Sequence, residues 1–192
     1  MRSQSAVAMV TDLRLGSNQY FTIGANASKI SRVSERVLWG GGGLYADVLS
    51  LGGTLKFHAN LYELREGRPM GPRTVSRVLA NLLYKARFSP FFLEPIVAGL
   101  DNEGKPYICS SDCIGAVDKE KPWAAVGTAA SEFTGMAETV WRPDLGDEEL
   151  FDTVSQCALA ALDRNALSGW GAVVHVVSKD GIVSRKIWQR LD

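Results

Sequence analysis

Two long helical stripes in succession constrain the fold more than any other feature of this chain. Apolar side chains recur at steps of three and four across residues 44–66, the spacing of one face of an α-helix. Gly67 and Pro69 follow, as is typical of a helix C-terminus. A second stripe starts near Pro72 and stops before Pro90. Strand-like segments flank this helix pair, so we expect the two helices to form one layer on a sheet.

The segments ahead of the first helix are short and rich in β-branched or aromatic residues, which is typical of strands. Four strands within about forty residues predict consecutive hairpins in an antiparallel sheet. The expected strands are residues 6–11, 19–24, 29–33 and 36–39.

Glycines interrupt this part of the chain twice. Residues 40–43 are all Gly, but they lack the Lys and Ser/Thr of a P-loop and do not match a dinucleotide fingerprint. We interpret them as a strand-to-helix joint at which backbones pass closely. Gly52 and Gly53 lie inside the first helical stripe, where each costs about 1 kcal/mol relative to Ala. Close packing against another element is the expected reason that they are tolerated.

The second half repeats the order of strands followed by helices. A hairpin is predicted from a strand at 95–100, a turn at 101–104 and a return strand at 106–109. The later expected elements are a strand at 123–127, a helix from about 128 to 141, a long helix from 147, and terminal strands at 172–177 and 182–188. This order fits one antiparallel sheet covered by helices on both faces, or two stacked sheets between helical layers.

Composition excludes several classes of function. The chain has 192 residues, which favours a single domain, and its 21 basic and 21 acidic side chains cancel. Without a basic stripe or an acidic tail, we expect no nucleic-acid partner and no membrane partner. No apolar run approaches the ~18–20 residues that would span a bilayer, and no signal peptide is recognisable, so we expect the protein inside the cell.

Cysteine and histidine do not form a metal or catalytic motif. The odd set of Cys109, Cys113 and Cys157 predicts reduced thiols. No second Cys/His pair completes a zinc site beside Cys109 and Cys113, so we expect no metal and interpret the thiols as small buried hydrophobes. His58 and His175 have no motif around them, and His175 lies in an apolar run that predicts a core position.

The stretch from residue 10 to residue 16 is the first candidate for a functional site. An apolar run over residues 6–10 leads into Asp12 and Arg14 and then into Gly16, which predicts a strand that ends in a tight turn. Side chains two apart in a strand point to the same side. Asp12 and Arg14 therefore either pair with each other or face the same cavity.

Several longer stretches resemble one protein family. Residues 55–67 (LKFHANLYELREG), 78–84 (VLANLLY), 94–101 (EPIVAGLD), 106–110 (PYICS) and 163–171 (DRNALSGWG) resemble the β subunits of the 20S proteasome. The match is nearest to the non-catalytic beta type-3 branch of that family. It covers roughly residues 6–192 and is strongest from Leu55 onward.

The resemblance implies an α+β, N-terminal nucleophile hydrolase fold. This fold is a four-layer αββα sandwich of two antiparallel sheets between helical layers, which agrees with the element order above. We therefore expect residues 1–192 to form a single proteasome beta-type domain, with its first strand apparently truncated.

The resemblance also implies a set of pocket residues. Active members use an N-terminal Thr whose hydroxyl attacks the peptide carbonyl and whose α-amine acts as base. Asp12, with Arg14 as companion, matches the Asp at the end of a strand in this pocket, and Lys29 matches the pocket Lys. Ser168 matches a late Ser, whereas Asn165 stands where active subunits have an Asp.

No residue corresponds to the nucleophile. Its position falls before Met1, and Thr128 stands where many relatives carry a Ser near the nucleophile. Beta type-3 subunits lack the catalytic Thr. We therefore interpret Asp12, Lys29, Asn165 and Ser168 as vestigial pocket positions. We expect Asp12, Arg14 and Lys29 to form an ion-pair network that holds the first sheet.

Together these points predict a non-catalytic structural subunit of the 20S proteasome β ring that serves assembly and the protein-degradation chamber. The expected partners are other β subunits in a heptameric ring, α subunits and the opposite β ring, in the cytoplasm and nucleus and without cofactors. One alternative is an active threonine-type endopeptidase subunit whose processed N-terminus lies outside this sequence. Another is a free-standing amidohydrolase of the same fold. Candidate interface anchors are among Trp39, Trp123, Trp141, Trp170 and Trp188.

Overall fold

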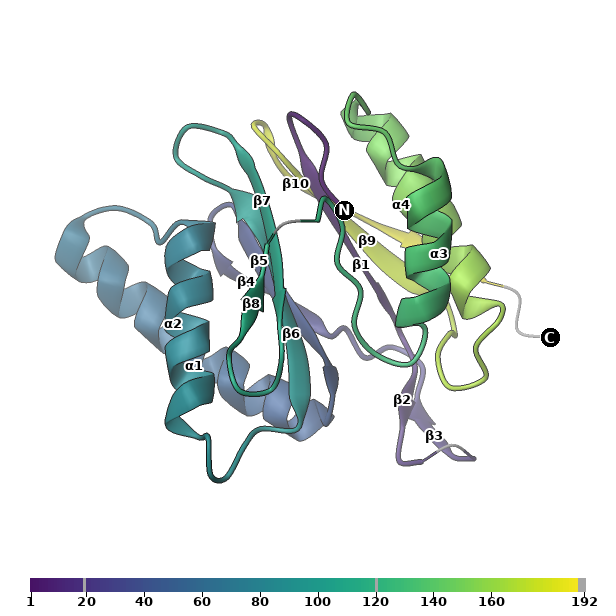
Figure 1. Cartoon of the computed structure of the whole chain (residues 1–192), viewed down its shortest axis with the longest axis horizontal. Coiled ribbons are helices and arrows are strands. Elements are labelled where there is room, and N and C mark those ends of the chain that lie inside the picture. Colours follow the sequence, from purple (N-terminus) through teal and green to yellow (C-terminus); the bar gives the residue numbers. More distant parts are fainter. Residues whose placement is uncertain (19, 120, 190–192) are drawn as a thin grey trace.

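Two antiparallel sheets lie face to face between two pairs of helices in the computed structural model, which describes residues 1–18, 20–119 and 121–189 (Figure 1). The three-stranded sheet has the order β1-β9-β10, and the five-stranded sheet has the order β4-β5-β6-β7-β8. The strands are β1 (Val7–Asp12), β4 (Ile30–Ser34), β5 (Val37–Gly43), β6 (Leu93–Leu100), β7 (Pro106–Ser111), β8 (Val117–Asp118), β9 (Ala172–Ser178) and β10 (Gly181–Ile187).

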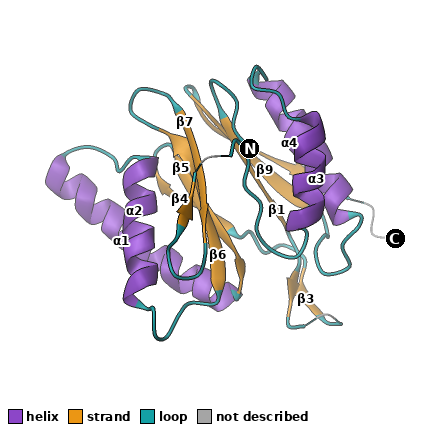
Figure 2. Cartoon of the chain, viewed as in Figure 1, coloured by secondary structure: helices purple, strands orange, loops and turns teal. Residues whose placement is uncertain are grey.

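Helix pairs cover the outer faces of both sheets (Figure 2). Helices α1 (Tyr45–Glu66) and α2 (Pro72–Lys85) pack on the five-stranded sheet. Helix α4 (Asp147–Leu162) packs on the three-stranded sheet, and α3 (Ala130–Val140) packs against α4 and shares its apolar cluster with that sheet. A third apolar cluster, which includes Val7, Met9, Ile96 and Val177, fills the space between the sheets. The predicted αββα sandwich is thus confirmed.

Strand β1 departs from the predicted run of consecutive hairpins. It pairs with β9 near the C-terminus, from Val7 opposite Val177 to Asp12 opposite Ala172. The next two strands, β2 (Leu15–Gly16) and β3 (Thr22–Gly24), form a separate two-stranded hairpin that projects from the body (Figure 1). The strand predicted at 19–24 is therefore shorter than expected, and its first residue, Gln19, lies outside the described residues.

The four consecutive glycines belong to β5 and do not form a joint between strand and helix. They pair with β6 from Gly40 opposite Ile96 to Gly43 opposite Leu93. The predicted close passage of backbones is nevertheless present, since a Cβ on Gly40 would lie 2.7 Å from the carbonyl oxygen of Lys29. A Cβ on Gly42 would likewise lie 3.0 Å from Cα of Gly127.

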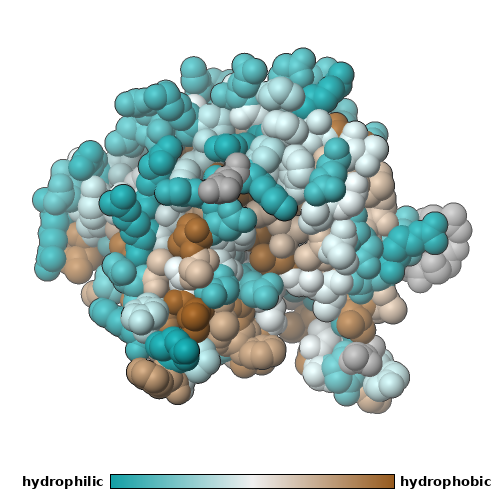
Figure 3. All heavy atoms as spheres, viewed as in Figure 1, coloured by the Kyte–Doolittle hydropathy of each residue, from teal (hydrophilic) through white to brown (hydrophobic). Residues whose placement is uncertain are grey.

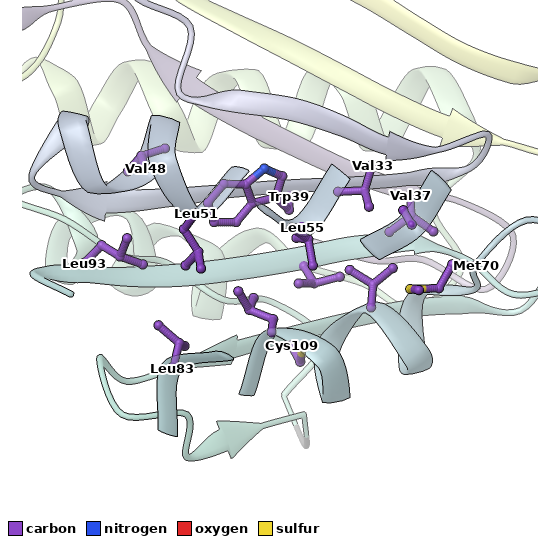
Figure 4. Packing of buried hydrophobic residues seen from close by; sticks show 14 of the residues in the cluster. Val33, Val37, Trp39, Val48, Leu51, Leu55, Met70, Leu83, Leu93 and Cys109 are labelled. Carbon is purple, nitrogen blue, oxygen red and sulfur yellow. The ribbon is translucent and has the colours of Figure 1, made fainter. Parts of the chain in front are cut away.

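The cluster beneath α1 and α2 explains one of the two helix glycines (Figure 4). Trp39 is 1% exposed in this cluster, and a Cβ on Gly52 would lie 2.9 Å from its Cζ2. Close packing is therefore confirmed for Gly52 but wrong for Gly53, whose Cβ would meet no atom within 4 Å. Burial of Trp39 also excludes it as an interface anchor, whereas Trp188 is exposed. Gly67 ends α1 in a left-handed conformation, as predicted.

The strand predicted at 123–127 is not a strand in the structure, and the short β8 was not predicted. Residues 123–126 keep the alternation of a strand all the same. Trp123 and Ala125 pack against the cluster under α3 and α4, whereas Ala124 and Val126 pack against the cluster between the sheets. The segment therefore has the side-chain pattern of a strand without a hydrogen-bonded neighbour among the described residues.

The remaining sequence expectations concern thiols, histidine and membranes. Cys109, Cys113 and Cys157 are free, and Cys109 and Cys157 are buried. His175 is only half-buried on β9, where its Nδ1 lies 2.6 Å from Ser184 Oγ and burial lowers its pKa. Across the described part of the chain, no helix has the length and apolar character needed to cross a membrane.

Candidate functional site

Asp12 and Lys29 meet where the two sheets face each other. Asp12 is the last residue of β1, and Lys29 directly precedes β4 in the other sheet. Lys29 Nζ donates a hydrogen bond to Asp12 Oδ1, with side chains that are only 22% and 14% exposed. Low exposure keeps this pair from being fully screened by water. The sandwich therefore brings two of the expected pocket residues together as an ion pair.

The turn over residues 167–171 closes on the same strand end. Gly169 N donates to Asp12 Oδ2 over 3.3 Å, and Leu13 N lies 3.2 Å from Gly169 O. Positive φ angles of 136° at Gly169 and 65° at Trp170 shape this turn, and the latter is uncommon for a residue with a side chain. Ser168 Oγ is buried there without a hydrogen-bond partner among the described residues.

Arg14 turns away from Asp12 and instead anchors the projecting hairpin. Its Nη1 donates to Leu167 O over 2.8 Å, its Nε to Thr22 Oγ1 over 2.9 Å, and its Nη2 to Asn18 O over 3.1 Å. Of the two alternatives for Asp12 and Arg14, a direct pair is therefore wrong. Both residues instead line the same cavity.

Asn165 and Thr128 take no direct part in the ion pair. Asn165 Oδ1 accepts a hydrogen bond of 2.7 Å from Leu167 N, so the amide holds its own turn. It does not line the cavity beside Asp12, whereas Thr128 and Ser168 do. The structure thus brings Asp12, Lys29 and Ser168 to one cavity and leaves Asn165 outside it.

The cavity has a volume of about 720 Å³ and adjoins the edge of β1. Two of its walls, the glycines of β5 and the buried Met1, were not predicted as parts of a cavity. The α-amino group of Met1 donates a hydrogen bond of 2.9 Å to Ala8 O, and burial lowers the pKa of this amine to about 5. The only signal for the glycine wall was four residues without side chains in succession, which leave space beside a strand.

The site has a charged corner at Asp12 and Lys29, and most of its other walls are apolar. Asp12 is the one hydrogen-bond partner of Lys29 Nζ among the described residues, so no described hydroxyl or thiol is activated by this ammonium. Nor do the described residues contain a cluster of three or more His, Cys, Asp or Glu side chains suited to a metal. The arrangement therefore supports structural ion pairing and apolar binding.

Comparison with known proteins gives consistent matches over the whole chain. The sequence profile of a family described as "Proteasome subunit" matches residues 1–177. A protein named "Proteasome subunit beta type-3" from Drosophila melanogaster is 41% identical over 193 residues, covering 100% of this chain and 94% of that protein. Proteins of the same name from Dictyostelium discoideum and Saccharomyces cerevisiae are 42% and 41% identical over 193 residues, with 94% and 93% of their lengths covered.

Proposed function

Because this chain belongs to the proteasome subunit family, we propose that it is a non-catalytic β subunit of the proteasome core particle. The observation that carries the proposal is likeness at about 40% identity, along the full chain, to proteins named proteasome subunit beta type-3. Their αββα architecture, expected from the resemblance, is also the one that this chain adopts.

The state of the pocket supports a non-catalytic role. Lys29 is paired with Asp12, and the second carboxylate oxygen of Asp12 is held by Gly169 N. Asn165 provides an amide where a carboxylate is expected in active members, and it is used within its own turn. These contacts fasten β1 to β4 and to the 167–171 turn, so the polar residues stabilise the fold.

Exposed apolar side chains support assembly with other subunits. The projecting hairpin carries Tyr20, Phe21 and Ile23, and the end of α2 and the loop after it carry Tyr84, Phe88 and Phe92. Figure 3 shows one face that is hydrophilic along its upper rim, with apolar residues gathered in its lower half. Contiguous exposed apolar residues are typical of protein interfaces. The proposed partners are β neighbours in a heptameric ring, α subunits and the opposite β ring, in the cytoplasm and nucleus.

Native purification through an affinity tag on this chain tests the proposal. We expect stoichiometric recovery of α and other β subunits in one particle, measured by native mass spectrometry. A discrete monomer or dimer would instead favour a free-standing amidohydrolase. Fluorescence of the tagged chain in both cytoplasm and nucleus is the expected localisation.

Labelling of the same particle with a Thr-directed electrophile separates the proposal from the active alternative. We expect catalytic subunits to gain the mass of the inhibitor and this chain to remain unmodified. Covalent modification of this chain would identify an active threonine-type endopeptidase subunit. An intact mass that matches a processed chain beginning at a Thr would do the same.

A further inference from the structure

Helix α2 carries positive charge only. Helices α3 and α4 contain acidic side chains and no basic one, and α1 mixes both signs. In contrast, α2 contains Arg73, Arg77 and Lys85 and no carboxylate. The one-sided charge extends past both ends of the helix, since residues 67–93 hold five basic side chains and no acidic one. The neutral total charge of the chain therefore conceals a local excess of positive charge.

Helical periodicity gathers these charges on one exposed face of α2. Its exposed side chains recur at steps of three and four and are Arg73, Arg77, Asn81, Tyr84 and Lys85, which we call the α2 stripe. The buried residues of α2 lie on its other side, in the cluster that covers the five-stranded sheet (Figure 1). At 1.5 Å per residue the stripe is about 18 Å long. The folded helix thus creates a basic surface that the composition did not indicate.

No ion pair within the described residues neutralises the α2 stripe. The ion pairs that these residues form use the cations of Lys29, Lys105 and Arg185, and none uses a cation of α2. Arg73 instead lies over the ring of Tyr107, with its Cζ 5.2 Å from the ring centroid. Like charges on one helix face repel each other. A partner that supplies carboxylates would therefore relieve this repulsion and form ion pairs at the same time.

The C-terminal end of the stripe is aromatic as well as basic. Tyr84 is 67% exposed, and Phe88, in the turn that follows α2, is 97% exposed. Arg87 N donates a hydrogen bond of 3.1 Å to Tyr84 O, so the chain continues to turn past Lys85 and brings Phe88 close to the end of the stripe. The Cζ atom of Arg87 lies 5.8 Å from the centroid of the Phe88 ring. Cations and exposed aromatic rings therefore occur together at this end.

We propose that the α2 stripe docks an acidic amphipathic segment of another protein. Carboxylates of the segment lie against the basic side chains of the stripe, and its apolar side chains lie against Tyr84 and Phe88. Charge complementarity selects this occupant, and the exposed rings require it to be apolar on one side. The inference goes beyond the proposed function, which names no partner chemistry for α2, and does not depend on it. Recovery of a multi-subunit particle and binding to the stripe are separate measurements.

Two other occupants fit the stripe less well. Nucleic acid is attracted by a wide positive field, whereas this chain has no net charge and carries acidic side chains on α3 and α4. A second copy of the chain could offer the carboxylates in the first turn of its α4. All three already accept hydrogen bonds within the chain, namely Asp147 from Ser5, Glu148 from Arg185 and Glu149 from Gly146 N.

A synthetic peptide tests the proposal on the purified chain. The probe is acetyl-Glu-Glu-Leu-Phe-Glu-Glu-Leu-Leu-Glu-Glu-amide, and its affinity is measured by calorimetric titration at low ionic strength. We expect binding, together with shifts of the amide resonances of Arg77 and Asn81. A form with Gln in place of every Glu loses the ionic contacts, and a form with Ser in place of every Leu and Phe loses the apolar ones. Each should bind at least about tenfold more weakly than the probe.

A matched pair of charge-reversal variants locates the binding site. Arg77→Glu combined with Lys85→Glu reverses two exposed charges of the stripe and should weaken peptide binding at least about tenfold. Arg142→Glu combined with Arg164→Glu makes the same change in net charge at exposed positions that follow α3 and α4. This control variant should bind the peptide as the parent chain does.

Four results would overturn the proposal. One is the absence of measurable peptide binding, and another is equal affinity for the probe and its Gln form. A third is an equal loss of affinity in the two double variants, because binding would then depend only on total charge. The fourth is a different occupant: a single-stranded oligonucleotide that binds the stripe more tightly than the peptide, or self-association of the chain that Arg77→Glu combined with Lys85→Glu abolishes.

Discussion

The ion pair between Asp12 and Lys29 should stabilise the fold as a coupled unit. Both side chains are mostly buried, so removal of one charge leaves the other without its partner in a poorly hydrated corner. Exposed pairs are worth about 0–1 kcal/mol, and loss of one member of a fully buried pair costs about 3–5 kcal/mol. For this intermediate burial we expect Asp12→Asn and Lys29→Met each to lower the free energy of unfolding by about 2 kcal/mol.

The double variant is the informative measurement. Asp12→Asn with Lys29→Met leaves no uncompensated charge, so it should cost about 1.5 kcal/mol, less than either single change. The coupling energy is then about 2.5 kcal/mol, measured by urea unfolding of the four proteins under identical conditions. Additive effects, with a double variant about 4 kcal/mol less stable than the parent, would refute a structural ion pair at this position.

Three further changes test other parts of the fold. Gly53→Ala should raise the free energy of unfolding by about 0.5–1 kcal/mol. Gly52→Ala should give a free energy of unfolding about 1–3 kcal/mol lower than that of Gly53→Ala, because its Cβ meets the Trp39 ring. Equal free energies for the two variants in urea unfolding would contradict this. Because burial lowers the pKa of His175, the unfolded state binds more protons than the folded state near and below pH 6.5. The free energy of unfolding should therefore fall as pH decreases through this range. In His175→Gln, the melting temperature should depend less on pH between pH 7 and 5. Arg14→Lys removes the forked contacts of the guanidinium, so amide exchange in β2 and β3 should accelerate at least about tenfold while exchange in β9 stays unchanged.

Local periodicity was sufficient to predict the helices and the hairpin of the five-stranded sheet. The apolar stripe over residues 44–66 corresponds to α1, and the turn at 101–104 joins β6 to β7. These elements depend on contacts between residues a few positions apart, so the periodicity of apolar residues and the turn residues is enough to predict them. The pairing of β1 with β9, in contrast, joins Val7 to Val177 and leaves no local signal.

The pocket was predictable only in part, and through resemblance. Asp12 and Lys29 were placed by matching motifs, and the structure joins them. Their spacing alone could not show that they pair, because Asp12 ends a strand of one sheet and Lys29 directly precedes a strand of the other. Asn165 was also placed in the pocket by matching a motif, but its side chain does not line the cavity. A local hydrogen bond from Leu167 N to its Oδ1, which the motif does not reveal, holds the side chain in its own turn.

The segment at 123–127 shows how a wrong secondary-structure prediction can carry information. Its residues alternate between two apolar layers, as a strand requires, yet it has no ladder of hydrogen bonds. Side-chain alternation depends on burial on both sides, whereas strand assignment depends on a paired backbone. The two criteria separate here because, among the described residues, the one backbone hydrogen bond to the start of this segment is the bond from Arg2 N to Pro122 O.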